Sequence, residues 1–125
     1  MAIKKLEHVG VMVKNMETSV HFYEQVLGLD LMERFAINAE VEIAFLGQNG
    51  QIYVELVANG SELPDEGKVN HIAFTADNME EEITRLKSQN VTFASKDYHT
   101  LENGTKFIFF QGPDGERLEL FQPAQ

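Results

Sequence analysis

Two histidines and two glutamates stand at positions where they could bind a metal ion. His8 and His71 are separated by 63 residues, and Glu55 and Glu119 by 64. Each histidine lies in an alternating apolar segment, and each glutamate interrupts an apolar run. Imidazole nitrogens and carboxylate oxygens bind divalent transition metals, so one His and one Glu from each half could provide four donors to one ion. A bound cation would also offset the cost of burying a carboxylate within a strand.

The same residue types also have a purely structural interpretation. A single histidine in a strand is more often a structural residue, and a single glutamate near a strand end is more often solvated. The recurrence of both roles in both halves favours a shared metal site. His21 and His99 have no histidine at the equivalent position of the other half, so neither is assigned a function.

An internal repeat positions these four residues. Shifting the chain by 63 residues aligns Asn15-Met16-Glu17 with Asn78-Met79-Glu80. The pattern of apolar residues around both tripeptides also agrees, which favours two copies of one unit. Each copy is predicted to form a βαβββ module. The modules are expected at residues 1–60 and 68–125, within a single domain that covers residues 1–125.

The first module is predicted to start with a strand and a helix. Alternation over residues 6–13 places His8 on the face opposite Val9 and Val11. A helix over 16–27 is expected to begin at an Asn15 cap and to end at Gly28. Strands are predicted at 29–35, 41–46 and 51–57, with a hairpin turn at residues 48–50.

The second module is predicted to repeat this order. It starts with a strand over 69–76 and a helix that Asn78 caps and that ends near Gln89. Strands are predicted at 91–94, 106–111 and 116–121. Residues 112–115 form the last turn, and residues 95–105 form a polar loop.

Composition excludes several classes of protein. The chain has 125 residues, 43% of them hydrophobic and nine of them Phe, which is enough for a core. The net charge of −10 opposes binding to nucleic acids or to anionic membranes. No apolar run is long enough to span a membrane, and the absence of cysteine excludes thiolate catalysis. The N-terminus lacks the apolar core of a secretory signal, and a cytoplasmic protein fits best.

Four segments carry a family resemblance. They are His8–Val11 (HVGV), Phe22–Leu29 (FYEQVLGL), His71–Phe74 (HIAF), and the GPDG turn at 112–115 followed by LELF at 118–121. With them the chain resembles the vicinal oxygen chelate superfamily, also called the glyoxalase/bleomycin-resistance/dioxygenase superfamily. The resemblance implies an α+β fold in which the two βαβββ modules form an open, curved, eight-stranded mixed sheet with helices outside. It also implies a homodimer.

Within that superfamily the chain is most similar to lactoylglutathione lyase (glyoxalase I). This resemblance implies that His8, Glu55, His71 and Glu119 are metal ligands, and that the cofactor is a divalent transition metal such as Ni, Zn, Co, Mn or Fe. Glu119 would act as the catalytic base, with Glu55 as the alternative. Asn59 matches an asparagine that contacts glutathione, whereas Met12 stands where glyoxalase I has an arginine.

The implied function is that of a metal-dependent lyase or isomerase. It would act through an enediolate on a hemithioacetal, or on a similar α-hydroxy carbonyl compound. The partner would be a small molecule such as a thiol adduct. Two alternatives remain open: another metal-dependent enzyme of the superfamily, such as a methylmalonyl-CoA epimerase, and a drug-binding dimer without enzymatic activity.

Overall fold

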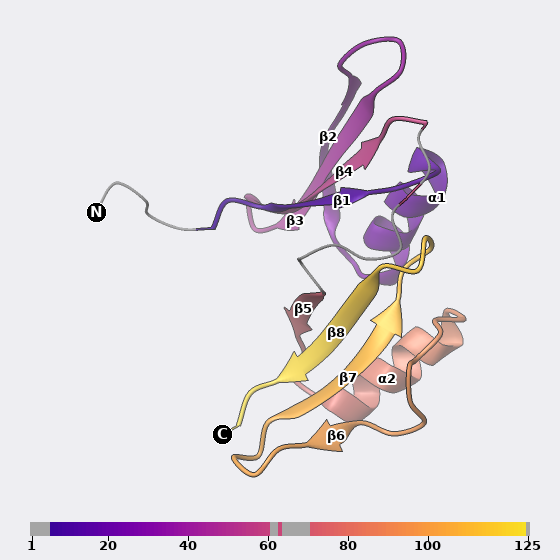
Figure 1. Ribbon diagram of the computed structural model, residues 1–125. Helices are drawn as coiled ribbons and strands as arrows, with labels where there is room; N and C mark the ends of the chain where they lie inside the picture. The colour runs from indigo at the N-terminus through magenta and orange to yellow at the C-terminus, as the bar shows by residue number, and fades with distance from the viewer. Residues whose placement is uncertain (1–5, 61–62, 64–70, 125) are drawn as a thin grey trace. The chain divides into compact units, whose positions relative to one another are not determined.

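Two four-stranded mixed sheets, one in each half of the chain, form the scaffold in the computed structural model (Figure 1). The structure describes residues 6–60, 63 and 71–124. The chain divides into two units, Met1–Pro64 and Asp65–Gln125. The predicted α+β fold of two βαβββ modules is confirmed, because both sheets have the same strand order, β1-β4-β3-β2 and β5-β8-β7-β6. The grouping of modules 1–60 and 68–125 into one domain stays a prediction.

The first unit follows the predicted order of elements. Its elements are β1 (Val9–Met12), α1 (Met16–His21), a π-helical segment η1 (Phe22–Val26), β2 (Asp30–Ala36), β3 (Glu42–Gln48) and β4 (Gln51–Ala58). Strand β1 is shorter than predicted, and His8 directly precedes it. The hairpin turn between β3 and β4 is as predicted, since Asn49 and Gly50 both have the positive φ that a tight two-residue turn requires.

The helical segment of the first unit begins as predicted but changes type. The Asn15 side chain accepts a hydrogen bond from the N–H of Thr18 at 3.0 Å, which caps α1. From Phe22 onward the helix widens, and the N–H of Leu27 donates to the carbonyl of Phe22, five residues earlier. The segment therefore covers the predicted range but is not α-helical throughout.

The second unit repeats this arrangement. Its elements are β5 (Ile72–Thr75), α2 (Met79–Ser88), β6 (His99–Thr100), β7 (Lys106–Gln111) and β8 (Arg117–Gln122). Asn78 caps α2 as predicted, and its side chain accepts a hydrogen bond from the N–H of Glu81. The first two residues of the predicted strand 69–76 lie outside the described residues. Helix α2 lies along one face of the sheet (Figure 1).

The predicted strand over 91–94 is wrong. This segment makes a single β-bridge, between Phe93 and Phe110, and the short strand β6 pairs with β7 instead. A turn separates the bridge from β6, in which the hydroxyl of Ser95 donates to the carbonyl of Asp97. This turn interrupts the pairing, so β6 lies within the segment predicted to be a polar loop.

Each sheet has one buried apolar face, and its other face carries the candidate glutamate beside a phenylalanine of the neighbouring strand. In the second unit, Ile108, Phe110, Leu118 and Leu120 form the buried face together with Met79 and Leu86 of α2. In the first unit, Val54 and Leu56 are fully buried. The glutamates between these residues therefore point to the opposite faces.

Among the described residues, neither helical segment has the length and apolarity that a membrane span would need.

Truncation of the α2 core residue should destabilise the protein. Leu86 is fully buried, so Leu86→Ala should lower the free energy of unfolding by about 2–5 kcal/mol through lost burial and a cavity. Urea denaturation would measure this change. Lys87→Ala is the control, because Lys87 is exposed on the same helix and should change stability by less than about 0.5 kcal/mol. Equal effects of both changes would contradict the assignment of Leu86 to the core.

Candidate metal centre

The first unit brings His8 and Glu55 together. Strand β1 pairs in parallel with β4 and places Gly10 opposite Glu55. His8 precedes Gly10 by two residues and therefore shares its face. The His8 Nε2 atom lies 3.5 Å from Glu55 Oε1. Two residues that are far apart in the sequence thus meet because the first and last strands of the module are neighbours.

The second unit builds the same pair with His71 and Glu119. Strand β5 pairs in parallel with β8 and places Ala73 opposite Glu119. The His71 Nε2 atom lies 3.3 Å from Glu119 Oε1. The Glu119 side chain is 10% exposed, against 25% for Glu55, so the second carboxylate is more shielded from water.

Each pair also includes a phenylalanine that the sequence analysis did not single out. Phe45 of β3 lies opposite Glu55, and Phe109 of β7 lies opposite Glu119. The rings meet their histidines at near-perpendicular angles, with centroid distances of 5.7 Å to His8 and 5.2 Å to His71. The two phenylalanines are related by the same shift of 64 residues as the glutamates. The recurrence of Phe at this spacing is the signal in the sequence that points to both residues.

The donor atoms of each pair are spaced as two ligands of one ion would be. Donors bound to a single divalent ion at about 2.0–2.2 Å lie about 3–3.6 Å from each other. Both Nε2–Oε1 distances fall in this range. The donor set therefore fits a divalent transition metal. Within the described residues, no group of three or more His, Cys, Asp or Glu side chains is positioned to hold a metal, and the structure brings two candidate ligands together in each unit.

The second ring nitrogen of His8 bears on how its ring is oriented. His8 Nδ1 is buried and has no hydrogen-bond partner among the described residues. Metal-binding histidines usually donate their second ring N–H to a neighbouring group, which fixes the ring. The orientation of His8 therefore depends on its contacts with Phe45 and Glu55.

A family comparison covers nearly the whole chain. The sequence profile of the Glyoxalase/Bleomycin resistance protein/Dioxygenase superfamily matches residues 5–120, which include all four candidate ligands. The chain belongs to this superfamily.

Relatives within the superfamily include proteins of known and unknown function. The uncharacterized protein YwbC of Bacillus subtilis (strain 168) is 42% identical over 123 residues, covering 95% of this chain and 98% of that protein. The lactoylglutathione lyase of Salmonella typhimurium is 32% identical over 126 residues, covering 94% of this chain and 92% of the lyase.

Two solved structures share the fold of this chain. A glyoxalase family protein from Enterococcus faecalis has a TM-score of 0.83 at 24% identity, covering 97% of this chain and 99% of that one. TnmS3, an antibiotic binding protein from Streptomyces sp. CB03234, has a TM-score of 0.77 at 21% identity, and 99% of each chain is covered. The same fold is thus found in proteins with different functions.

Two further residues were expected to contact a substrate in this superfamily. Met12 is the last residue of β1 and lies opposite Val57, on the face that carries Glu55. Asn59 directly follows β4, four residues after Glu55, and is half-buried. Their positions are close to the candidate ligand in the same unit, and their contact with a substrate stays a prediction.

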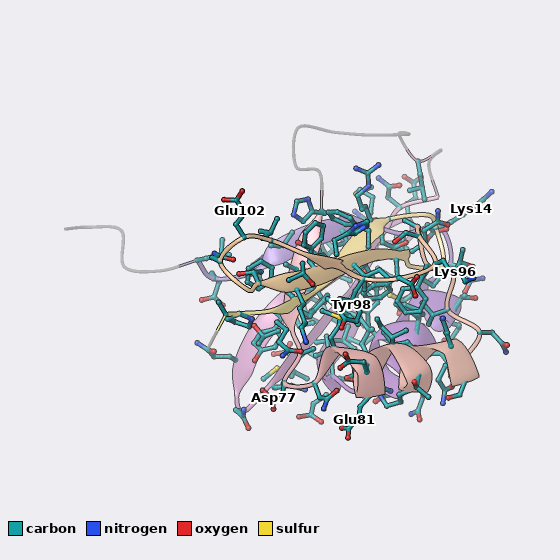
Figure 2. All side chains as sticks on the ribbon, turned by 90° about the horizontal axis from the view of Figure 1, so that it is seen from below. Lys14, Asp77, Glu81, Lys96, Tyr98 and Glu102 are labelled. Atoms are coloured by element: carbon teal, nitrogen blue, oxygen red, sulfur yellow. The ribbon has the colours of Figure 1, made fainter. Side chains whose placement is uncertain are left out.

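The remaining histidines and Lys106 lie away from the two His–Glu pairs. His21 is exposed at the end of α1. His99 is exposed on β6, where its ring contacts Phe107. Tyr98, labelled in Figure 2, lies between α2 and β6. Its hydroxyl donates a hydrogen bond to Glu80 at the start of α2, and Lys106 Nζ lies 5.3 Å from the centroid of its ring. This hydrogen bond holds the pKa of Glu80 below its usual value. It also connects the segment between α2 and β6 to the start of α2.

A depression of about 480 Å³ in the first unit is separate from the candidate ligands. Its main charged groups form an ion network. Arg34 donates to Glu42 and to Glu17, each at 2.6 Å, and this contact holds the pKa of Glu17 below its usual value. The guanidinium that lines this depression is therefore paired with carboxylates of its own unit.

Proposed function

We propose that the chain is a metal-dependent glyoxalase-like lyase or isomerase that converts a hemithioacetal into an α-hydroxy thioester. The observation that supports this proposal is the duplicated His–Glu pair, with the same strand positions and nearly the same donor spacing in both units. The 32% identity to a lactoylglutathione lyase supports the same reaction class.

His8, Glu55, His71 and Glu119 would hold one divalent ion, such as Ni, Zn, Co, Mn or Fe. The four donors would come from one chain or from two copies in a homodimer, which we also propose as the assembly. When bound, such an ion would act as a Lewis acid that polarises the two neighbouring oxygens of the substrate. The residues of the chain would then perform the proton transfer.

Glu119 would be the base. Its carboxylate would take the proton from the hydroxyl-bearing carbon of the hemithioacetal, and the electrons of that C–H bond would form the carbon–carbon double bond of an enediolate. Glu119 would return the proton to the adjacent carbon, and the hydroxyl proton of the first carbon would pass to the oxygen of the second, so that the first carbon becomes the thioester carbonyl and the second bears the hydroxyl. The reaction is a net isomerisation, so it requires no external oxidant or reductant. Glu119 fits this role better than Glu55 because its shielding from water favours proton transfer to carbon.

The substrate would enter beside residues of the first unit. Asn59 would bind a polar group of the thiol portion through its amide. Met12 offers an apolar thioether on the same face as Glu55, where glyoxalase I has an arginine. The thiol portion is therefore not required to be glutathione.

An activity assay tests this proposal directly. Protein reconstituted with each candidate metal should convert the hemithioacetal of methylglyoxal with glutathione, or with another thiol, to a thioester that is detected by its ultraviolet absorbance. Turnover should require at least stoichiometric metal. If the protein binds metal but converts no hemithioacetal, the lyase proposal is wrong and an epimerase becomes the next candidate. If it binds no metal, the drug-binding dimer replaces both.

A further inference from the structure

The two units are not equivalent at the position next to the glutamate. Histidine, glutamate and phenylalanine recur in both units, but the residue two positions before the glutamate is Tyr53 in the first unit and Arg117 in the second. Residues two apart in a strand lie on the same face, about 7 Å apart. Side chains that bind one shared ion can be the same in both units. A substrate with two different ends, in contrast, requires side chains that differ between the units. The position of Arg117 is therefore one where substrate specificity can be encoded.

Arg117 is held close to the second His–Glu pair. It lies on β8 opposite Gln111, on the face that carries Glu119. Its guanidinium carbon lies 5.9 Å from the centroid of the Phe109 ring, a cation–π contact. The same ring contacts His71 and lies opposite Glu119. Arg117 thus stacks on the ring against which the candidate ligand packs.

The carboxylate of Glu119 gives its face of the sheet a negative charge, so a cation on that face would help an anionic substrate to bind. A substrate anion near Glu119 would be repelled, in a protein whose net charge is −10. The other cations on the strands and helix of the described part of this unit lie elsewhere: Arg85 pairs with Glu82 on α2, Lys87 is exposed on α2, and Lys106 contacts Tyr98. Among these elements, Arg117 is the cation that the strand register places on the Glu119 face.

We propose that Arg117 is a specificity-determining residue that binds a carboxylate on the thiol portion of the substrate. This inference rests on the function proposed above. A guanidinium has five N–H donors, so it can bind a carboxylate through two of them while keeping its contacts within the chain. The substrates selected in this way are hemithioacetals of acidic thiols, and uncharged thiol adducts are disfavoured.

Two matched thiols test this selectivity. Hemithioacetals of methylglyoxal with 3-mercaptopropionate and with 3-mercaptopropionamide differ only in the carboxylate. The wild-type protein should prefer the acid by about 10–100-fold in kcat/KM, the range of one charge-assisted hydrogen-bonded pair. Arg117→Gln should abolish the preference by raising KM for the acid, and should leave the amide nearly unchanged. Arg85→Gln removes the same charge from α2 and should keep the preference.

A binding measurement separates failure of this inference from failure of the proposed reaction. Succinic monohydroxamate and its amide present two neighbouring oxygens and are not turned over, so calorimetry of the metal-loaded protein compares their dissociation constants. An Arg117-dependent preference for the acid, without turnover of any hemithioacetal, would support Arg117 and refute the lyase. Equal affinity for acid and amide in the wild type, an equal loss of both in Arg117→Gln, or no binding of either compound would overturn the role of Arg117.

Discussion

Replacing Glu119 by Gln should lower kcat by about 10²–10⁴, because it removes the group that accepts the proton. The amide keeps the size of the side chain and one oxygen that can bind a metal, so the fold should remain intact. The expected loss is in kcat, since proton transfer occurs after the substrate has bound. Steady-state kinetics with a hemithioacetal, together with metal analysis of the purified variant, would measure the effect.

Glu55→Gln provides the matched control for this prediction. It makes the same chemical change at the equivalent strand position, and it should be milder, because Glu55 is the more exposed carboxylate and is not the proposed base. If Glu119→Gln keeps its metal and nearly full turnover while Glu55→Gln is inactive, the base belongs to the first unit. If both variants keep their metal and full turnover, the enediolate mechanism is wrong.

Removing the imidazole of His71 should weaken metal binding by more than about 100-fold. Loss of a group that only orients a ligand costs about 10–100-fold, and loss of a ligand itself should cost more. The effect should be seen in a competition titration with a chromophoric chelator, which reports affinity without requiring activity. Glu119 would also lose its partner at 3.3 Å in His71→Ala.

His21→Ala is the control for His71→Ala. His21 is exposed on α1, and it should bind metal as weakly as any surface histidine. Wild-type affinity in His71→Ala would exclude His71 from the ligand set. A similar loss in both variants would indicate that the measured binding is not specific to the candidate site.

The local signals in the sequence were sufficient for most of the scaffold. Asn15 and Asn78 predicted both helix starts, and Asn49-Gly50 predicted the hairpin, because each acts through a short-range backbone requirement. The strand 91–94 was wrong, because its apolar residues matched a strand but the turn at Ser95 limits its pairing to a bridge. The π-helical segment was missed, because the apolar spacing that predicts a helix does not distinguish between helix types.

The candidate site shows the same division between local and non-local information. The side of the strand on which Glu55 and Glu119 lie followed from alternation, and the partners of the histidines were suggested by the repeat. The contacts of Phe45 and Phe109 depend on register across two strands, which a pattern within one segment does not encode. The repeat does not indicate Arg117, because a repeat marks residues that the two halves share, whereas Arg117 differs from its counterpart Tyr53.

The strand order also bears on how quickly a bound ion could exchange. In each sheet the glutamate lies on an inner strand, β4 or β8, which is paired on both sides, whereas the histidine directly precedes β1 or β5 at one end of the strand order. A short outer strand can fray while the core of its module stays folded. The imidazoles would therefore leave first and the carboxylates would remain in place, so an ion could dissociate and be replaced without unfolding of either module.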